Sequence, residues 1–534
     1  METAVCARRA PISWAAAARG GGLAGAPPPR TTTLTEIADP NAALPAAAPP
    51  RRRAAPLLPL LVAGCFALAA LSLLLPSVPT QDSWSWIVWG REVVHLDLDT
   101  TAGSSWKPLP VLFTSVFSLF GDAAPELWLV VARAGGLLAI LFAYRIALRL
   151  AGHAAGVVAA IALVSADWLR YLAHGNVEPL SAGLVLGAVD RHLDGHRHQA
   201  AFLAFLAALG RPEIFPFLLA YAVWMFVRIE GTHRVAIVAL LLAVPALWLG
   251  GDWWGAGDPF YGSSKAAGFK ERQQHRAAAV ARRGAAGKNL SASGTPGVRN
   301  TLKGASDILM IPIEVAALVG ILFAWRRRRR EALLLAAAAV ALIVMVAAMV
   351  LLGYGGSPRF LFPAAGLVSV LAGVGVAGVL GAFGGDGDGG RGDRSARVRA
   401  AAVGALLVAA FAPFVVTRVG TLSDRADDID LRTQLQDHLD QAVAAAGGGA
   451  RLRALGHPRI NPSFSHQLAW DLDVPMRAVG PLRYPAVLFD GPQTRVSPGA
   501  GPRIPRARPG VTVKRLAAVG GWVAAAVNDT RPGR

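Results

Sequence analysis

Cysteine is almost absent from this chain. Of its 534 residues only Cys6 and Cys65 are cysteines, and they lie in different parts of the sequence. A disulfide framework is therefore excluded, and any domain outside a membrane must be held together by packing alone. Charged residues are also scarce, at 16% of the chain, whereas hydrophobic residues make up 54%. This balance points away from an ordinary soluble protein.

Long apolar runs dominate the composition. Runs of roughly 18 residues or more recur along most of the chain, which is typical of helices that cross a bilayer core of roughly 30 Å. Residues 1–53 are rich in Ala, Pro and Gly without an apolar period, so we expect a disordered cytoplasmic tail. Residues 55–78 are too long for the apolar core of a signal peptide. The sequence therefore predicts a multi-pass plasma-membrane protein whose N-terminus is cytoplasmic.

The basic balance of the chain has a topological explanation. A net charge of +19 would suggest nucleic acid as the partner of a soluble protein. Here the basic residues lie in short loops between apolar runs, most clearly at 326–330, where they mark the cytoplasmic side. We therefore expect membrane lipids, and not nucleic acid, among the partners.

The positive-inside rule favours about eleven transmembrane helices. The run at 111–120 is too short to span and is expected to be an interfacial or re-entrant helix, because counting it as a span would place the arginine runs outside. The predicted spans are 55–78, 126–148, 154–169, 178–189, 200–209, 214–227, 235–249, 308–325, 332–352, 361–380 and 400–416.

The sequence thus predicts an all-α polytopic membrane domain over 54–417. Its two large external loops are expected at 79–125 and 250–306. After residue 417 the composition changes to one amphipathic helix followed by short apolar runs between Gly and Pro clusters. This alternation predicts a small extracytoplasmic α/β domain over 418–534.

With this topology the polar residues suited to chemistry fall on the extracytoplasmic face. Asp82 lies just beyond the first span, where carboxylates are often only solvated. Asp97 and Asp99 have the spacing of a metal-binding acid pair, although alternate acids are common in loops. Lys107 precedes the interfacial helix, where a lysine either snorkels to headgroups or contacts a lipid phosphate. Glu178 begins a helix, which is also where a carboxylate acts as a simple cap.

Further candidates lie in later loops on the same face. Arg211 belongs to an R-P-E turn, where a short-range ion pair is the plain alternative to a phosphate contact. Arg359 precedes an apolar helix, which suits anchoring and phosphate binding equally. Trp84, Trp106 and Tyr261 are candidates to stack on a sugar, and aromatic residues also form belts at membrane interfaces.

The order and sidedness of these elements resemble the GT-C glycosyltransferases. The closest likeness is to the protein mannosyltransferase and aminoarabinose transferase branch, and it covers roughly 55–416. The elements are an acid opening the first external loop (Asp82), a Lys-Pro element (Lys107, Pro108), an early Arg133 followed by GLLAILFAYRIALRLAG, a carboxylate at an external helix start (Glu178), the R-P-E turn (Arg211 to Glu213) and RFLFP (Arg359 to Pro363).

The resemblance implies a site. The first-loop acid of that superfamily is catalytic or orients the substrate, which corresponds to Asp82, and the Lys-Pro lysine that contacts the donor phosphate corresponds to Lys107. The family often has two adjacent acids where this chain has Asp82 and Ser83. Use of a divalent metal therefore stays open, as does the identity of a second carboxylate, for which the candidates are Asp97, Asp99 and Glu178.

The expected function is transfer of a sugar from a polyprenyl-phosphate donor to a glycan, lipid or protein acceptor, with inversion. Asp82 would act as general base with a pKa raised by its low-dielectric surroundings. Lys107, Arg211 and Arg359 would neutralise the departing phosphate. The alternatives are a lipid or solute transporter or flippase, which would show internal repeats and polar residues near the bilayer midplane, and a non-catalytic scaffold.

Overall fold

The computed structural model describes residues 57–164, 166–228, 230–267, 308–352, 357–384, 394–497 and 501–531, together with positions 299, 303 and 306. All of these residues belong to one compact unit, Leu57–Arg534. The predicted cytoplasmic tail at 1–53 lies outside the described residues, as does most of the predicted external loop at 250–306.

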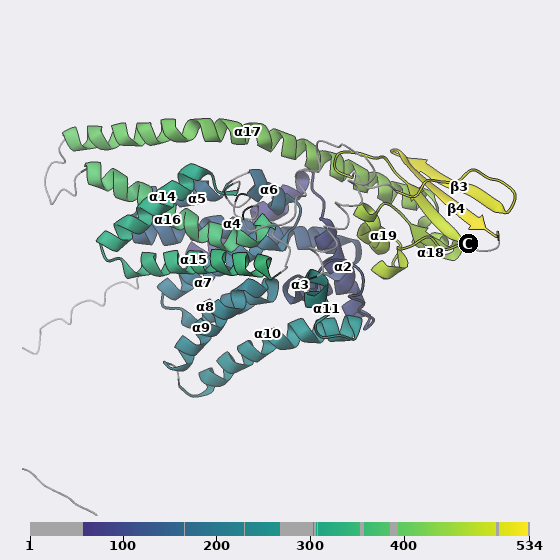
Figure 1. The fold of residues 1–534 in the computed structure, drawn as a ribbon, viewed down its shortest axis with the longest axis horizontal. Coiled ribbons are helices and arrows are strands. Elements are labelled where there is room, and N and C mark those ends of the chain that lie inside the picture. Colours follow the sequence, from purple (N-terminus) through teal and green to yellow (C-terminus); the bar gives the residue numbers. More distant parts are fainter. Residues whose placement is uncertain are drawn as a thin grey trace, which may run out of the picture. The chain divides into compact units, whose positions relative to one another are not determined.

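Helices make up most of the described part of the chain (Figure 1). The first set is α1 (Leu57–Leu71), α2 (Gln81–Val94), α3 (Pro108–Phe117), α4 (Ala124–Ala151), α5 (His153–Leu163), α6 (Ala166–Ala173), α7 (Val177–Leu193), α8 (Arg197–Gly210), α9 (Phe215–Phe226), α10 (Thr232–Ala256) and α11 (Tyr261–Ala267). The later helices are α14 (Ile311–Arg326), α15 (Arg330–Leu351), α16 (Phe362–Gly384), α17 (Arg394–Ala445), α18 (Gly448–Leu455) and α19 (Ser465–Asp471).

The helical part has the character of a multi-pass membrane protein. Within the described residues, 6 helical stretches are long and apolar enough to cross a bilayer. Large apolar side chains on these helices face outward, as at Leu60, Leu242 and Leu334, which are 61%, 65% and 70% exposed. Such surfaces suit lipid and not water. The polytopic helical class is confirmed, whereas the count of eleven spans and their orientation remain predictions.

The centre of the bundle is formed by α4, α7 and α16, which pack on one another and on α5, α8 and α14. Small residues allow this close packing. A Cβ atom added at Gly183 of α7 would overlap the carbonyl oxygen of Gly135 in α4, so glycine is required at that crossing. The backbones of α4 and α7 therefore approach closely, and the first turn of α7 carries Glu178, which belongs to the site described below.

The stretch expected to be a polar loop at 81–110 begins with a helix. The side chain of Thr80 caps α2 by accepting a hydrogen bond from the Ser83 backbone N–H at 3.4 Å. Trp86 and Trp89 are completely buried by this helix. Part of the loop expected at 79–125 is therefore helical, because the tryptophans of α2 are buried at helical spacing against α3 and α4. The external position of this segment stays a prediction.

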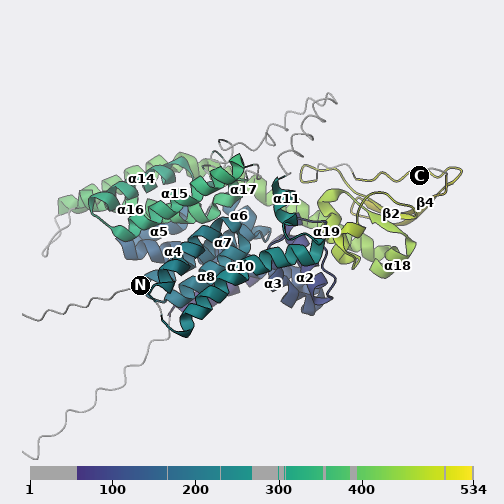
Figure 2. The same cartoon turned by 60° about the horizontal axis from the view of Figure 1, so that its bottom comes forward.

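The segment α17 joins two elements that were expected to be separate. The predicted span at 400–416 and the predicted amphipathic helix at 424–445 form one 52-residue helix. The boundary expected between residues 417 and 418 falls inside it. Both views show α17 passing α6 and continuing to α19 and the sheet (Figure 1, Figure 2).

The C-terminal part contains the predicted mixture of helix and strand. Its strands are β1 (His457–Arg459), β2 (Ala486–Asp490), β3 (Val511–Val519) and β4 (Trp522–Asp529), in a 4-stranded sheet of order β1-β2-β4-β3. The pair β1 and β2 is parallel, and the other neighbours are antiparallel. Leu439, Phe489 and Trp522 share a core between α17 and the sheet. The expectation of a small α/β part is confirmed.

A set of polar contacts attaches this C-terminal part to α2. The guanidinium group of Arg91 donates hydrogen bonds to the carbonyl oxygens of Trp470 and Val474 at 3.1 and 2.9 Å. It also pairs with Asp473 at 3.1 Å and lies 5.1 Å from the ring centroid of Trp470. The last turn of α2 is thereby attached to the C-terminal part.

Candidate active site

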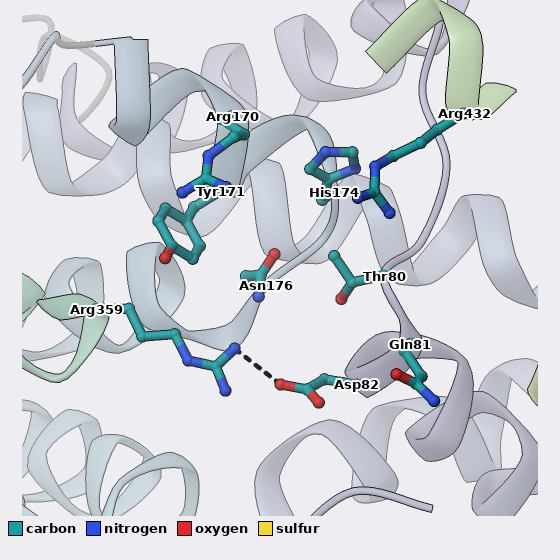
Figure 3. Close-up of a pocket in the computed structure, with 9 residues that line it drawn as sticks. All are labelled: Thr80, Gln81, Asp82, Arg170, Tyr171, His174, Asn176, Arg359 and Arg432. Atoms are coloured by element: carbon teal, nitrogen blue, oxygen red, sulfur yellow. Dashed lines mark hydrogen bonds and ion pairs between the residues drawn. The ribbon is translucent and has the colours of Figure 1, made fainter. Parts of the chain in front are cut away.

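Asp82 lies in the first turn of α2 and receives two hydrogen bonds. The hydroxyl of Ser104 donates to Asp82 Oδ1 at 2.6 Å. Arg359 Nη1 donates to Asp82 Oδ2 at 2.8 Å, the contact drawn in Figure 3. Arg359 comes from the short helix Pro358–Leu361 that leads into α16. Residues 277 positions apart in the sequence are thus joined at the end of the apolar bundle.

A second carboxylate extends this ion pair. Glu178, in the first turn of α7, is 1% exposed. Its Oε1 atom lies 3.0 Å from Arg211 Nη1 and 3.5 Å from Arg359 Nε. Arg211 in turn pairs with Glu213 at 2.6 Å. The result is a continuous line of alternating charge from Asp82 through Arg359 and Glu178 to Arg211.

Lys107 brings one more cation to this line. It immediately precedes α3, is 6% exposed, and holds its Nζ atom 4.9 Å from the ring centroid of Trp86. Among the described residues, no oxygen accepts a hydrogen bond from Nζ and no carboxylate pairs with it. An anionic ligand would supply the acceptor that this ammonium group lacks.

The electrostatic balance sets the protonation states. Burial raises the pKa of Asp82, but the charges of Arg359 and Lys107 and the hydrogen bonds from Ser104 and Arg359 outweigh it, so this pKa lies well below its usual range. Burial lowers the pKa of Lys107 to about 8; Glu178 opposes this, whereas Arg211 and Arg359 reinforce it. The expectation of a raised pKa at Asp82 is wrong, because its low-dielectric surroundings also contain paired cations. Asp82 is an anion and Lys107 a cation at neutral pH.

A cavity of about 300 Å³ opens beside the ion pair of Asp82 and Arg359 (Figure 3). Its walls come from the start of α2, the segment between α6 and α7, the residues before α16, and α17. The lining residues are Thr80, Gln81, Asp82, Arg170, Tyr171, His174, Asn176, Arg359 and Arg432.

Two of the candidate acids lie elsewhere. Asp97 is exposed beyond the end of α2, and the backbone N–H of Asp99 donates to Glu92 Oε2 at 3.0 Å. Asp99 also pairs with Arg477 at 3.0 Å. Glu92 is ten residues after Asp82, which is about 15 Å along an α-helix. The structure therefore does not bring Asp97 or Asp99 to Asp82, and Glu178 is the carboxylate that it places near the ion pair.

The aromatic candidates are used in packing. Trp84 donates its indole N–H to Gln436 at 3.2 Å, and Trp106 donates to the carbonyl oxygen of Leu247 at 3.1 Å. Both are buried. Tyr261 donates its hydroxyl to the carbonyl oxygen of Thr101 at 2.9 Å. None of the three lines the described cavity of Asp82; Trp84 and Trp106 are buried, whereas Tyr261 is half-buried. Sugar stacking by these rings stays a prediction.

Several residues that contact Asp82 or line the cavity beside it were missed by reasoning from the sequence. Ser104 is an unremarkable serine in the SS dipeptide before Trp106, and Tyr171 and Asn176 flank a short helix end. Arg432 sits on an amphipathic helix that reads as part of a separate domain. The HGNVEP run that contains Glu178 was the only local signal, since His174 and Asn176 belong to it.

The donor set does not fit a divalent cation. Among the described residues, no three His, Cys, Asp or Glu side chains gather into a group that could hold a metal ion. The carboxylates of Asp82 and Glu178 are both directed at guanidinium groups. Hard cations require several oxygen ligands converging on one point. Asp82 and Glu178 do not form such a convergent set of ligands among the described residues.

Comparisons with known proteins give distant structural likenesses. No protein-family model matches the chain, and no curated protein does. The structure is similar to ArnT from Cupriavidus metallidurans in the apo state, with a TM-score of 0.48, 16% identity and coverage of 88% of this chain and 97% of that one. For ArnT from Cupriavidus metallidurans bound to undecaprenyl phosphate, the TM-score is 0.46 and the identity 15%, with coverage of 88% of this chain and 98% of that one. For the apo form of the oligosaccharyltransferase of Archaeoglobus fulgidus, the TM-score is 0.41 and the identity 15%, with coverage of 82% of this chain and 66% of that one. At these TM-scores the function must be argued from the residues of this chain.

Proposed function

We propose that this protein is a membrane glycosyltransferase that moves a sugar from a polyprenyl-phosphate donor to an extracytoplasmic glycan, lipid or protein acceptor, with inversion at the sugar. The observation that carries the proposal is the ammonium group of Lys107, which has no acceptor among the described residues and lies beside the ion pair of Asp82 and Arg359. This combination suits an anion and a nucleophile at neighbouring positions, at the end of helices suited to lipid.

The cations suit a phosphate held at the surface of a bilayer. Lys107, Arg211 and Arg359 come from three separate segments and meet around Glu178. Charge-assisted hydrogen bonds to a phosphate are roughly twice as strong as neutral ones. The polyprenyl chain of the donor would lie along the apolar outer surfaces of the helices, and the phosphate would contact Lys107 first because its charge is unpaired.

The reaction needs a base and a stabilised leaving group. A hydroxyl oxygen of the acceptor attacks the anomeric carbon, the bond from that carbon to the phosphate oxygen breaks, and the hydroxyl proton passes to Asp82. The electron pair of the broken bond remains on polyprenyl phosphate, whose added charge is stabilised by Lys107, Arg211 and Arg359. Asp82 is ionised throughout the neutral range, so its basic form is always present.

The ion pair between Asp82 and Arg359 also couples donor binding to catalysis. While Arg359 donates to the carboxylate, Asp82 is a weak base. A donor phosphate competes for the same guanidinium group. Its arrival would reduce the stabilisation of the Asp82 anion and so raise the pKa of this carboxyl. Asp82 would become a stronger base only when a donor is bound.

The test is transfer by the purified full-length protein in lipid nanodiscs. Radiolabelled polyprenyl-phosphate mannose and polyprenyl-phosphate arabinose are supplied with an acceptor fraction of cell-envelope glycans, lipids and proteins, and labelled product is separated from donor. We expect transfer by the wild type and a loss of roughly 10²- to 10⁴-fold in Asp82→Asn, the usual contribution of a general base. The matched control is Asp97→Asn, at an exposed carboxylate beyond the far end of α2, which should behave as wild type.

Two results would contradict the proposal. If Asp82→Asn transfers sugar as fast as Asp97→Asn, Asp82 is not the base. If the protein in sealed vesicles moves labelled donor between leaflets without breaking the bond between sugar and phosphate, the molecule is a transporter and not a transferase.

A further inference from the structure

A second cavity adjoins the one that contains Asp82. It measures about 250 Å³ and is lined by Pro79, Thr80, Gln81, His174, Arg432, Gln436, Ser463, Phe464 and Val496. Thr80, Gln81, His174 and Arg432 line both cavities. Together the two volumes fall within the roughly 300–1,000 Å³ typical of sites for small ligands. A ligand with one end at Asp82 can therefore extend past Arg432 into the second cavity.

The second cavity lies where the beginning of α2 meets the C-terminal part. The side-chain amide of Gln81 donates to the carbonyl oxygen of Pro462 at 3.1 Å across this junction. Gln436 of α17 accepts from Trp84 at 3.2 Å, which holds its amide at the wall. The cavity thus exists only because α17 carries the C-terminal part back onto α2. This explains why neither sequence segment alone indicates it.

The combined lining of the two cavities carries a net positive charge. Arg170 and Arg359 line the first cavity and Arg432 lines both, whereas Asp82 is the single carboxylate among the lining residues and is paired with Arg359. Burial and the charges of Arg432, Arg170 and Arg133 lower the pKa of His174 to about 4, so its ring is neutral. This field favours an oxyanion near Arg432.

Among the described residues Arg432 makes neither an ion pair nor a hydrogen bond, although it is half-buried and directed toward His174 (Figure 3). The charge of Asp428 acts on it only from a distance. Asp428, one helical turn earlier on α17, is paired with Arg495 at 2.7 Å. A partly buried guanidinium group gains most from a ligand that supplies the missing acceptor. Of the cations assigned to the donor phosphate, Lys107 and Arg211 line neither cavity and Arg359 lines only the first, so Arg432 is the one arginine that lines the second cavity.

Resting on the proposed transferase function, we infer that the acceptor is an anionic saccharide. One of its hydroxyl groups lies at Asp82, and a phosphate or carboxylate group on the same saccharide is bound by Arg432 in the second cavity. Phe464 offers an apolar face and Ser463 a hydroxyl on the wall opposite the membrane helices. Arg432 is thus a specificity residue for the acceptor, supplied by α17.

The test measures binding of defined disaccharides to the full-length protein in nanodiscs. Three probes of one disaccharide are used: a neutral form, a 6-phosphate and a uronate. We expect the better anionic probe to bind the wild type roughly 10- to 100-fold more tightly than the neutral probe, the range for hydrogen bonds to charged groups. Arg432→Gln should remove this preference and Arg432→Lys should keep part of it. Arg515→Gln, at an exposed arginine of β3, is the matched control.

Comparison of the two anionic probes identifies the oxyanion. Equal binding of neutral and anionic probes by the wild type, or an unchanged preference in Arg432→Gln, would overturn the inference. Transfer assays separate it from the proposed function. If neutral and anionic acceptors are glycosylated equally well, the transferase stands and the acceptor site fails. If the anionic probe binds through Arg432 but no donor ever transfers sugar, the anion site stands and the transferase proposal fails.

Discussion

The charge on Lys107 should limit the use of donor at alkaline pH. Its pKa of about 8 means that the ammonium group is charged below pH 8 and neutral above it, while the phosphodiester of the donor keeps its negative charge. A group with this pKa is about nine-tenths charged at pH 7 and about one-tenth charged at pH 9. If the phosphate binds the charged form, kcat/KM for the donor should fall about tenfold between these two pH values.

The assay is the pH dependence of kcat/KM for the donor at saturating acceptor, because this quantity reports the ionisation of the free enzyme. Lys107→Arg should lose the alkaline decline, since a guanidinium group remains charged across this range. Lys107→Gln should lower kcat/KM at pH 7 by roughly 10- to 150-fold, the equivalent of about 1.5–3 kcal/mol for a hydrogen bond to a charged group. Its residual activity should show no alkaline decline.

The reasoning would be refuted by a wild-type profile that stays flat to pH 10. It would also be refuted if Lys107→Arg declined at the same pH as the wild type, because the titrating group would then lie elsewhere. Thermal unfolding of each variant at pH 7 and pH 9 serves as the control for loss of folded protein.

Two further predictions concern stability. Glu178→Gln should lower the free energy of unfolding by about 1.5–3 kcal/mol, because Arg211 and Arg359 lose this buried carboxylate but keep Glu213 and Asp82 as partners. Glu126→Gln, at an exposed first-turn carboxylate, should have little effect. Fluorescence-detected thermal unfolding measures both variants, and equal midpoints would contradict the role of Glu178. Gly183→Ala should destabilise the protein by about 1–3 kcal/mol, because the added Cβ atom would meet the backbone of Gly135. Gly64→Ala, with nothing within 4 Å of the added atom, should leave stability unchanged. An unchanged unfolding midpoint for Gly183→Ala would show that α4 and α7 can separate without cost.

The membrane helices were predictable because apolar runs need no partner to be recognised. A stretch such as α15 is expected to be helical in a bilayer, because only a helix satisfies all its backbone hydrogen bonds within the segment. The α/β character of the C-terminal part was also predictable, from short apolar runs between Gly and Pro. Helix α2 was harder to predict from the sequence. Trp86 and Trp89 have the spacing of buried residues on a helix, but they lie among charged residues that suggest a loop.

The site was predictable in its residues but not in its pairing. Asp82, Glu178 and Arg359 each follow or begin an apolar segment, so topology alone places them on one face. Whether Arg359 would neutralise Asp82 could not be known, because the ion pair depends on the relative positions of α2 and α16. For the same reason the sequence predicted a raised pKa for Asp82, whereas its surroundings in the structure lower that pKa.

The sequence by itself determined that this chain is a polytopic helical membrane protein with a small α/β part, and that its reactive side chains begin or end apolar segments. Those properties follow from local composition, which acts over a single helix. Only the tertiary structure decided that Lys107 lacks an acceptor among the described residues while Asp82 has two donors, and that Arg432 reaches the same cavity from α17. Such pairings depend on packing between segments hundreds of residues apart, and no local pattern encodes them.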